Sequence, residues 1–215
     1  MFGVNAPPLN ASVRRLVSKT ANTWPPNIYA LSAHERDRDG RRVLPRIVHR
    51  KPRPGDVHPL NPAMVRDLLW CVPAAYIYGL KAVELRPRRG GVGQPYGVYL
   101  RGEKTIGLYS CPRDIWQFST QVWPNHQAIL SCGARLAECQ EDKASVLVEW
   151  VDPEGLWRLY THTLFHELGH HYVNQYRSSR GRPSTRKRNE GLADLHDTKI
   201  SINLIRRIAK RHAGA

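Results

Sequence analysis

The chain has 215 residues, 41% of them hydrophobic, and carries a formal net charge of +15 at pH 7. This length and hydrophobic content predict one packed domain, or one domain with arms. No run of 18 apolar residues occurs, which excludes a membrane-spanning helix, and residues 1–20 lack the apolar segment of a secretory signal. We therefore expect a cytoplasmic protein that makes no contact with a membrane.

The first part of the chain is predicted to be an arm rather than a domain. Residues 1–60 are rich in proline and arginine, and their prolines interrupt any long element. A short helix is expected at residues 11–18, capped by Asn10, and residues 36–41 are typical of a polar turn. Residues 43–49 form either a short strand or an extended arm.

The folded domain is predicted to occupy residues 61–215. Asn61 and Pro62 provide a helix cap and a first-turn proline, so a helix should run to about Cys71 and end at Val72-Pro73. The next elements are expected in this order: a strand at residues 76–86, a flexible connection at 87–95, a hairpin of residues 96–101 and 105–110, a helical turn at 112–118, and a helical or irregular segment at 127–141.

The last third of the chain contains one strand and two long helices. The strand is predicted at residues 145–151, a helix at 153–176, and a second helix at 189–212 with an apolar stripe that includes Ile200. This order indicates an α+β fold, with a small antiparallel or mixed sheet packed on the first long helix. Residues 145–151 or 105–110 could supply an edge strand that receives an extended peptide.

The first long helix contains the sequence His166-Glu167-Leu168-Gly169-His170. Residues four apart lie on one face of a helix, so His166 and His170 can both direct a ring nitrogen at one metal ion. Glu167 can reach a water molecule bound to that metal. Gly169 destabilises a helix relative to alanine, which is understandable if another backbone or a metal ligand passes close to it.

The second helix supplies a third metal ligand. It begins with Asn189-Glu190-Gly191-Leu192-Ala193-Asp194, in which Glu190 and Asp194 share a face. A catalytic zinc needs three protein ligands, and two histidines with one glutamate form such a set. Asp194 suits a position behind the ligands, where it accepts a hydrogen bond from the free ring nitrogen of His166. Asp197 shares the ligand face and is a second candidate for that role.

Together these residues resemble the gluzincin zinc metallopeptidases, the thermolysin-type group. The separation of His170 from Glu190 (190 − 170 = 20) is also similar to that group. The resemblance covers residues 155–199, and a looser likeness exists to compact bacterial metallopeptidases of the ImmA/IrrE type. It implies a minimal zincin-like domain that binds zinc through His166, His170 and Glu190 and hydrolyses a peptide or protein substrate. Glu167 would be the general base, and Asp194 would orient a ligand.

The downstream subdomain that helps to stabilise the oxyanion in thermolysin-like enzymes is not expected in this chain. A donor for the oxyanion must then come from elsewhere. The candidates are His171, Tyr172, Tyr109, His126 and His196, and the sequence does not distinguish them.

Positive charge is concentrated in residues 36–53 and 177–188. These basic loops suggest a polyanionic partner, either nucleic acid or an acidic protein, although solvated loops that only keep the protein soluble are the alternative. A second hypothesis follows, in which the chain is a non-catalytic, zinc-stabilised protein that binds nucleic acid through its basic arms. Glu167 favours the enzyme, because a structural zinc site needs no carboxylate beside it. A third hypothesis treats both histidines as ordinary helix residues.

The four cysteines are expected to be reduced thiols, since no secretory signal is present. They are Cys71, Cys111, Cys132 and Cys139. Cys132 and Cys139 could contribute to a second metal site, but their spacing fits no standard zinc motif.

Overall fold

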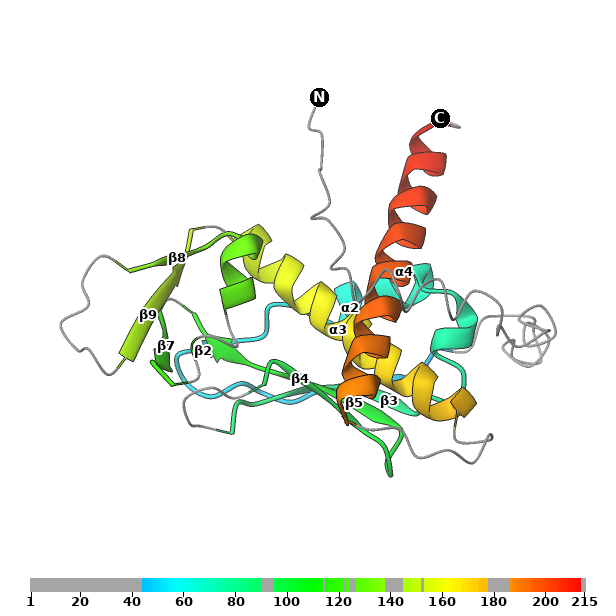
Figure 1. The fold of residues 1–215 in the computed structure, drawn as a ribbon, viewed down its shortest axis with the longest axis horizontal. Coiled ribbons are helices and arrows are strands. Elements are labelled where there is room, and N and C mark those ends of the chain that lie inside the picture. Colours follow the sequence, from blue (N-terminus) through cyan, green and yellow to red (C-terminus); the bar gives the residue numbers. More distant parts are fainter. Residues whose placement is uncertain are drawn as a thin grey trace.

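A mixed four-stranded sheet lies beneath two long helices that cross each other (Figure 1). The computed structural model describes residues 44–89, 95–113, 115–121, 123, 127–137, 145–151, 153–177 and 186–213. The helix predicted at 11–18 and the turn predicted at 36–41 lie outside them, as do His126 and Cys139. The predicted α+β class is confirmed. Within the described part, no helix combines the length and apolar character needed to cross a membrane.

The four-stranded sheet has the order β1 (Arg46–His49), β3 (Ala82–Arg86), β5 (Thr105–Tyr109) and β4 (Gly97–Leu100). The first three strands are parallel, and β4 forms the predicted antiparallel hairpin with β5. Strand β1 comes from the segment assigned to the N-terminal arm, so the sheet extends across the boundary placed at residue 60.

The other strands of the described residues form two smaller sheets. β2 (Asp56–Val57) pairs with β6 (Cys111–Pro112), and β9 (Ser145–Trp150) lies between β7 (Ile115–Ser119) and β8 (Ala134–Leu136). The expectation of an edge strand at 145–151 or 105–110 is wrong, because β9 and β5 are both central strands. The edges of the larger sheet are β1 and β4.

The helical turn predicted at residues 112–118 is also wrong. That segment contains β7, in which Ile115 and Gln117 are exposed while Trp116 and Phe118 are buried. This period of two is typical of a strand with one buried face. The strand predicted at 76–86 is confirmed only for Ala82–Arg86, because Ala74–Tyr76 forms a 3-10 helix, η2, and Gly79 turns the chain with a φ of +75°. The undecided segment 127–141 begins with another 3-10 helix, η4 (Gln127–Cys132).

The helices predicted from Asn61 to about Cys71, at residues 153–176 and at residues 189–212 are present. In α2 (Pro62–Cys71), the side chain of Asn61 accepts a hydrogen bond of 2.9 Å from the backbone N–H of Met64, and Pro62 occupies the first turn. Helix α3 (Pro153–Arg177) and helix α4 (Arg186–Ala213) carry the proposed metal ligands.

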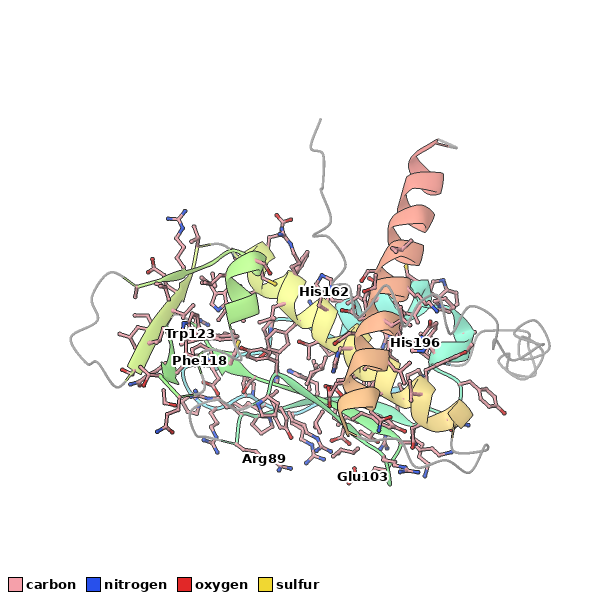
Figure 2. The ribbon with its side chains drawn as sticks, viewed as in Figure 1. Arg89, Glu103, Phe118, Trp123, His162 and His196 are labelled. Carbon is pink, nitrogen blue, oxygen red and sulfur yellow. The ribbon has the colours of Figure 1, made fainter. Side chains whose placement is uncertain are left out.

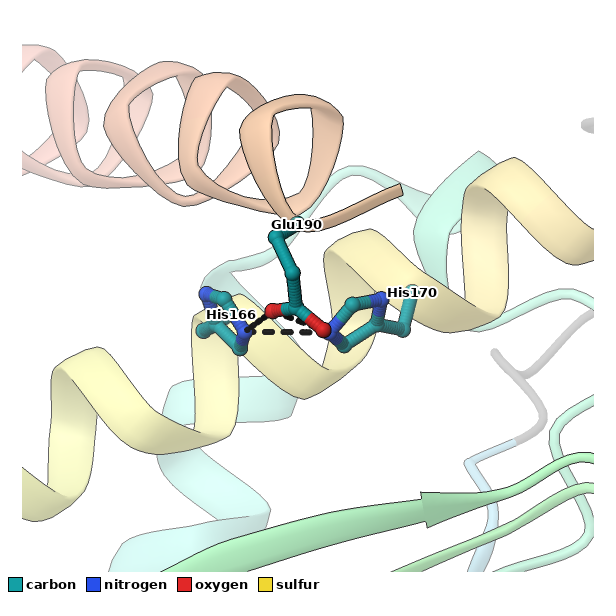
Figure 3. A group of neighbouring side chains, drawn as sticks. All are labelled: His166, His170 and Glu190. Carbon is teal, nitrogen blue, oxygen red and sulfur yellow. Dashed lines mark hydrogen bonds and ion pairs between the residues drawn. The ribbon is translucent and has the colours of Figure 1, made fainter. Parts of the chain in front are cut away.

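Helix α3 packs on one face of the sheet through an apolar core. On that face, Val83 lies opposite Ile106 and Leu85 lies opposite Leu108 across β3 and β5, and all four are almost fully buried. Leu164 and Leu168 of α3 belong to the same buried cluster. Helix α4 lies on the other side of α3 (Figure 3), so the order of layers is sheet, α3, α4.

Gly169 allows the two helices to approach closely. A Cβ atom at this position would lie 2.7 Å from the carbonyl oxygen of Ala193 and 2.9 Å from its Cα. The expectation that another backbone passes close to Gly169 is therefore confirmed. This contact brings the first turns of α4 onto the middle of α3.

Candidate metal centre

Three side chains from α3 and α4 converge on one point (Figure 3). The Nε2 atoms of His166 and His170 are 3.0 Å apart. One carboxylate oxygen of Glu190, Oε2, lies 3.4 Å from each of these nitrogens. These residues form a group that could hold a metal ion, with all ligand atoms within 4.8 Å of one another.

The spacing of the three atoms fits a tetrahedral ion. Zinc binds histidine nitrogen and carboxylate oxygen at about 2.0–2.1 Å, and the edge of such a tetrahedron is about 3.3 Å. The three observed separations are 3.0, 3.4 and 3.4 Å. Two imidazoles and one carboxylate suit a divalent transition metal better than Mg²⁺ or Ca²⁺, which prefer ligand sets made of oxygen.

Asp194 holds the ring of His166. Its Oδ1 atom lies 2.9 Å from Nδ1 of His166, on the side of the imidazole away from the other ligands. Since a carboxylate can only accept, Nδ1 carries the proton and the Nε2 lone pair points at the centre of the group. The structure thus brings all four residues together: His166, His170, Glu190 and Asp194.

Asp197 does not contact the ligands. Its carboxylate lies 3.3 Å from Nδ1 of His162, one turn before His166 on α3, and also accepts a hydrogen bond from Ser201. His162 was not identified in the sequence, although its position four residues before His166 places it on the ligand face. The hydrogen bond with Asp197 raises the pKa of His162 more than burial lowers it.

The pKa values of His166 and His170 shift in opposite directions. Burial tends to lower the pKa of His166, but the hydrogen bond with Asp194 and the charges of Glu167, Asp194 and Glu190 outweigh burial and raise it. The pKa of His170 is lowered by burial and by the neighbouring charge of His166. A low pKa keeps His170 neutral, which is the form that binds a metal.

Glu167 points from α3 toward the sheet rather than toward α4. It is only 8% exposed, and burial raises its pKa to about 7, although the charge of His166 and a hydrogen bond with the backbone of Tyr99 oppose this effect. The carboxyl group therefore lies between the histidine ligands and the edge strand β4.

The close approach of β4 to Glu167 depends on Gly97. A Cβ atom at this position would lie 2.6 Å from Cγ2 of Thr163 and 3.2 Å from Cγ of Glu167. A side chain at Gly97 would therefore force either β4 or the side chain of Thr163 to move. Neither Gly97 nor the Tyr99 contact was identified in the sequence, because no local pattern reports which strand will meet a helix.

The side chain of Tyr99 anchors the same strand to α3. His171 lies with Nε2 2.9 Å from the carbonyl oxygen of Tyr78, which can only accept, so Nε2 carries the proton. The other nitrogen, Nδ1, accepts a hydrogen bond of 3.1 Å from the Tyr99 hydroxyl. Asn174 in turn donates to that hydroxyl at 3.4 Å. These contacts fasten β4 beside Glu167.

The described oxyanion candidates have other partners. His171 is fully buried and uses both ring nitrogens as above. Tyr172 packs on Tyr76 and His196, and the Tyr76 hydroxyl lies 2.9 Å from Nδ1 of His196. Tyr109 lies on the opposite face of the sheet, under the guanidinium of Arg89. The structure therefore assigns none of these four to the oxyanion.

Among the described cysteines, Cys71, Cys111 and Cys132 are reduced thiols that form no disulfide. Burial raises the pKa of the Cys111 thiol to about 12, so this side chain is a small apolar group rather than a nucleophile.

Comparison of the chain with protein-family models, with curated proteins and with solved structures finds no match. The geometry of the site itself is therefore the basis on which a function can be assigned.

Proposed function

We propose that the protein is a zinc-dependent metallopeptidase that hydrolyses peptide bonds with Glu167 as general base. The observation that carries this proposal is the convergence of His166 Nε2, His170 Nε2 and Glu190 Oε2 at tetrahedral spacing, with the Glu167 carboxyl group beside them. Zinc in this position would lower the pKa of a bound water toward neutrality and polarise a substrate carbonyl.

Glu167 has the properties of a proton carrier. Its pKa of about 7 means that the carboxylate can accept a proton and release it again near neutral pH. In the proposed reaction, one oxygen of Glu167 accepts the proton of the attacking water and then gives it to the nitrogen of the leaving amine. Asp194 keeps His166 in the tautomer that presents Nε2 to the metal.

Strand β4 is a suitable place for the peptide. The backbone N–H of Tyr109 donates to the carbonyl of Tyr96, so alternate residues of β4 bond to β5. The backbone groups of Gly97 and Tyr99 face the other edge of β4, where no described strand pairs with it. An extended peptide could add to this edge by backbone hydrogen bonds. The Glu167 carboxyl group already bonds to the backbone of Tyr99 there, so a peptide on β4 would lie beside the base.

The alternative from the sequence is a zinc-stabilised binding protein with no catalytic role. It would use the same three ligands but would give no function to a buried carboxyl group between the ligands and an open strand edge. Burying a carboxyl group destabilises a protein unless the group is used or paired. The position of Glu167 therefore favours the enzyme.

The test compares wild type with Glu167→Gln in an unbiased peptide library. Glutamine keeps the size of the side chain and removes the base, so zinc content should be unchanged while cleavage falls by about 10²- to 10⁴-fold. Glu154→Gln is the matched control, because Glu154 is an exposed acid on the same helix. Cleavage that persists in Glu167→Gln, with contaminating proteases excluded, would contradict the mechanism. A zinc-loaded wild type that cleaves nothing would favour the binding protein.

A further inference from the structure

The face of the four-stranded sheet away from α3 is covered by arginine side chains. Side chains alternate along a strand. Because Val83 and Leu85 point toward α3, Glu84 and Arg86 point away from it, opposite Gly107 and Tyr109 of β5. Arg89 and Glu103 lie on this side of the sheet in Figure 2, away from the helices. We call this surface the arginine face; it consists of Arg46, Arg50, Arg53, Arg86, Arg88 and Arg89.

In a sheet that is covered on both faces, a helix would pack on this side. Here, arginine side chains cover this face instead. Arg86 lies across the strand beside it, since a Cβ atom on Gly107 would be 3.2 Å from Cδ of Arg86. The guanidinium of Arg89 lies 5.8 Å from the ring centroid of Tyr109, and Nη2 of Arg53 donates to the carbonyl of Arg89 at 2.7 Å. The six side chains form a layer on this face, in which Arg53 bonds to Arg89 and Arg46 lies opposite Ala82 of β3.

Two carboxylates of this surface, Glu84 and Asp56, lie beneath the arginines. Glu84 bonds to Arg86 at 2.9 Å and to Arg50 at 3.4 Å, and the side chain of Arg50 is 59% exposed while that of Glu84 is 11% exposed. Arg88 bonds to Asp56 at 3.2 Å, with side-chain exposures of 35% and 3%. Arg50 and Arg88 thus reach the solvent while the buried acids hold them in place from below, whereas the side chain of Arg86 is only 17% exposed.

The layer keeps a positive excess after these pairs are counted. Among the described residues, three carboxylates form ion pairs with it, Glu84, Asp56 and Glu103, which is fewer than its six arginines. Arg50 shows how such a side chain can bind an anion. Its guanidinium has five N–H donors, one of which bonds to Glu84, and its side chain is 59% exposed while the buried carboxylate holds it in place.

The partner that fits this surface has to bind through charge rather than through apolar contacts. Among the described residues, none of the exposed large apolar side chains belongs to β1, β3, β4 or β5; they are Trp70, Ile115, Leu130, Leu136, Val151, Trp157 and Ile202. Protein interfaces usually place aromatic or aliphatic anchors at their centre, and membrane-surface helices insert apolar side chains. A phosphate backbone needs neither, and arginine binds phosphate through paired N–H donors.

We propose that the arginine face binds the phosphate backbone of a nucleic acid. The face lies across the sheet from the metal centre, so a bound nucleic acid and a peptide on β4 would occupy different sides of the protein. The proposal does not depend on the peptidase reaction. Glu167→Gln is expected to bind nucleic acid as wild type does, so the two proposals can fail separately.

The test measures the salt dependence of binding to a fluorescein-labelled 20-base-pair DNA duplex of mixed sequence. Each phosphate contact contributes about 0.9 to the slope of log affinity against log salt concentration. The triple variant Arg46→Ala, Arg53→Ala, Arg89→Ala keeps the arginines that pair with buried acids, and its slope should fall by about 2.7. The matched control removes the same charge from three exposed arginines on α2, β8 and α3: Arg66→Ala, Arg135→Ala, Arg158→Ala. It should keep the wild-type slope.

Three outcomes would overturn the proposal. The first is an equal loss of slope in both triple variants, which would mean that only net charge matters. The second is tighter binding of wild type to poly-glutamate or to anionic lipid vesicles than to the duplex at the same salt concentration. The third uses wild type alone, so it does not depend on the variants folding. A duplex with photoreactive phosphates should cross-link to residues 44–57 and 82–89, and cross-links confined to α2, α3 and α4 would contradict the assignment.

Discussion

The Nδ1 atom of His166 lies 2.9 Å from Oδ1 of Asp194. One turn of α3 earlier, Nδ1 of His162 makes the corresponding contact with Asp197 at 3.3 Å. Both pairs join a histidine ring nitrogen to an aspartate carboxylate. Only in the first pair does the other ring nitrogen, Nε2 of His166, lie close to two further candidate ligands, His170 and Glu190. His162 and Asp197 therefore provide matched controls, on the same two helices, for the residues of the candidate metal centre.

The first prediction concerns the metal ligands. Replacing His170 by Ala should abolish stoichiometric zinc binding, because two protein ligands are fewer than a tetrahedral site requires. His162→Ala, on the same face of α3, should keep the full zinc content. Metal content per chain, measured by mass spectrometry after gel filtration, separates these outcomes. Full zinc occupancy in His170→Ala would show that the site is assigned incorrectly.

The second prediction concerns Asp194, which contacts the candidate ligand His166. Asp194→Ala should weaken zinc affinity by about 10- to 100-fold, since residues that orient a ligand histidine typically have effects of this size. Asp197→Ala should leave zinc affinity close to the wild-type value. Competition with a chromophoric chelator gives both dissociation constants. Equal affinities in wild type and Asp194→Ala would mean that Asp194 does not support His166.

The third prediction concerns pH. The pKa of His162 is raised above its ordinary value of 6.5 by Asp197. The pair therefore stabilises the fold fully below pH 6.5, and this contribution disappears as the pH rises through the folded-state pKa. Asp197→Asn should lower the free energy of unfolding at pH 5.5, by at most about 1 kcal/mol for so exposed a pair, and should have a smaller effect at pH 8.5.

Two measurements check this result. Urea unfolding at both pH values gives the difference in stability, and NMR titration of His162 should show a lower pKa in the variant. An equal loss of stability at both pH values would indicate a packing effect rather than the loss of an ion pair.

The fourth prediction concerns the helix crossing. Gly169→Ala would place a methyl group 2.7 Å from the carbonyl oxygen of Ala193, and relieving such a contact typically destabilises a protein by about 1–3 kcal/mol. Ala193 lies between Glu190 and Asp194, so zinc affinity should also fall although no ligand has changed. Gly102→Ala is the control, because no atom lies within 4 Å of its added Cβ. Unchanged stability and affinity in Gly169→Ala would contradict the described crossing.

The features that could be predicted from the sequence are those that depend on a single helix. The cap at Asn61, the helical spacing of His166 and His170, and the shared face of Glu190 and Asp194 all follow from local geometry. The close backbone at Gly169 was also expected, because glycine inside a helix needs a reason.

What could not be predicted depends on contacts between distant segments. Asp197 was placed with the ligands because it shares their face of α4, but helix crossing angles decide which residue of a face meets which partner, and Asp197 meets His162. The edge strand was misassigned because the order of strands is a property of the whole sheet. Gly97 and Tyr99 were missed for the same reason, since their roles exist only where β4 meets α3.

His170 and His171 are consecutive residues with unrelated tasks. The first supplies a nitrogen to the candidate metal centre, and the second fastens Tyr99 of β4 to α3. The edge strand β4 and the candidate ligands are thus connected through consecutive residues of one helix, with no loop between them. Loops gain and lose residues readily, whereas the cross-section of an α-helix is constant. The distance between a peptide bound on β4 and the candidate metal ligands would therefore stay the same when loops elsewhere in the chain gain residues.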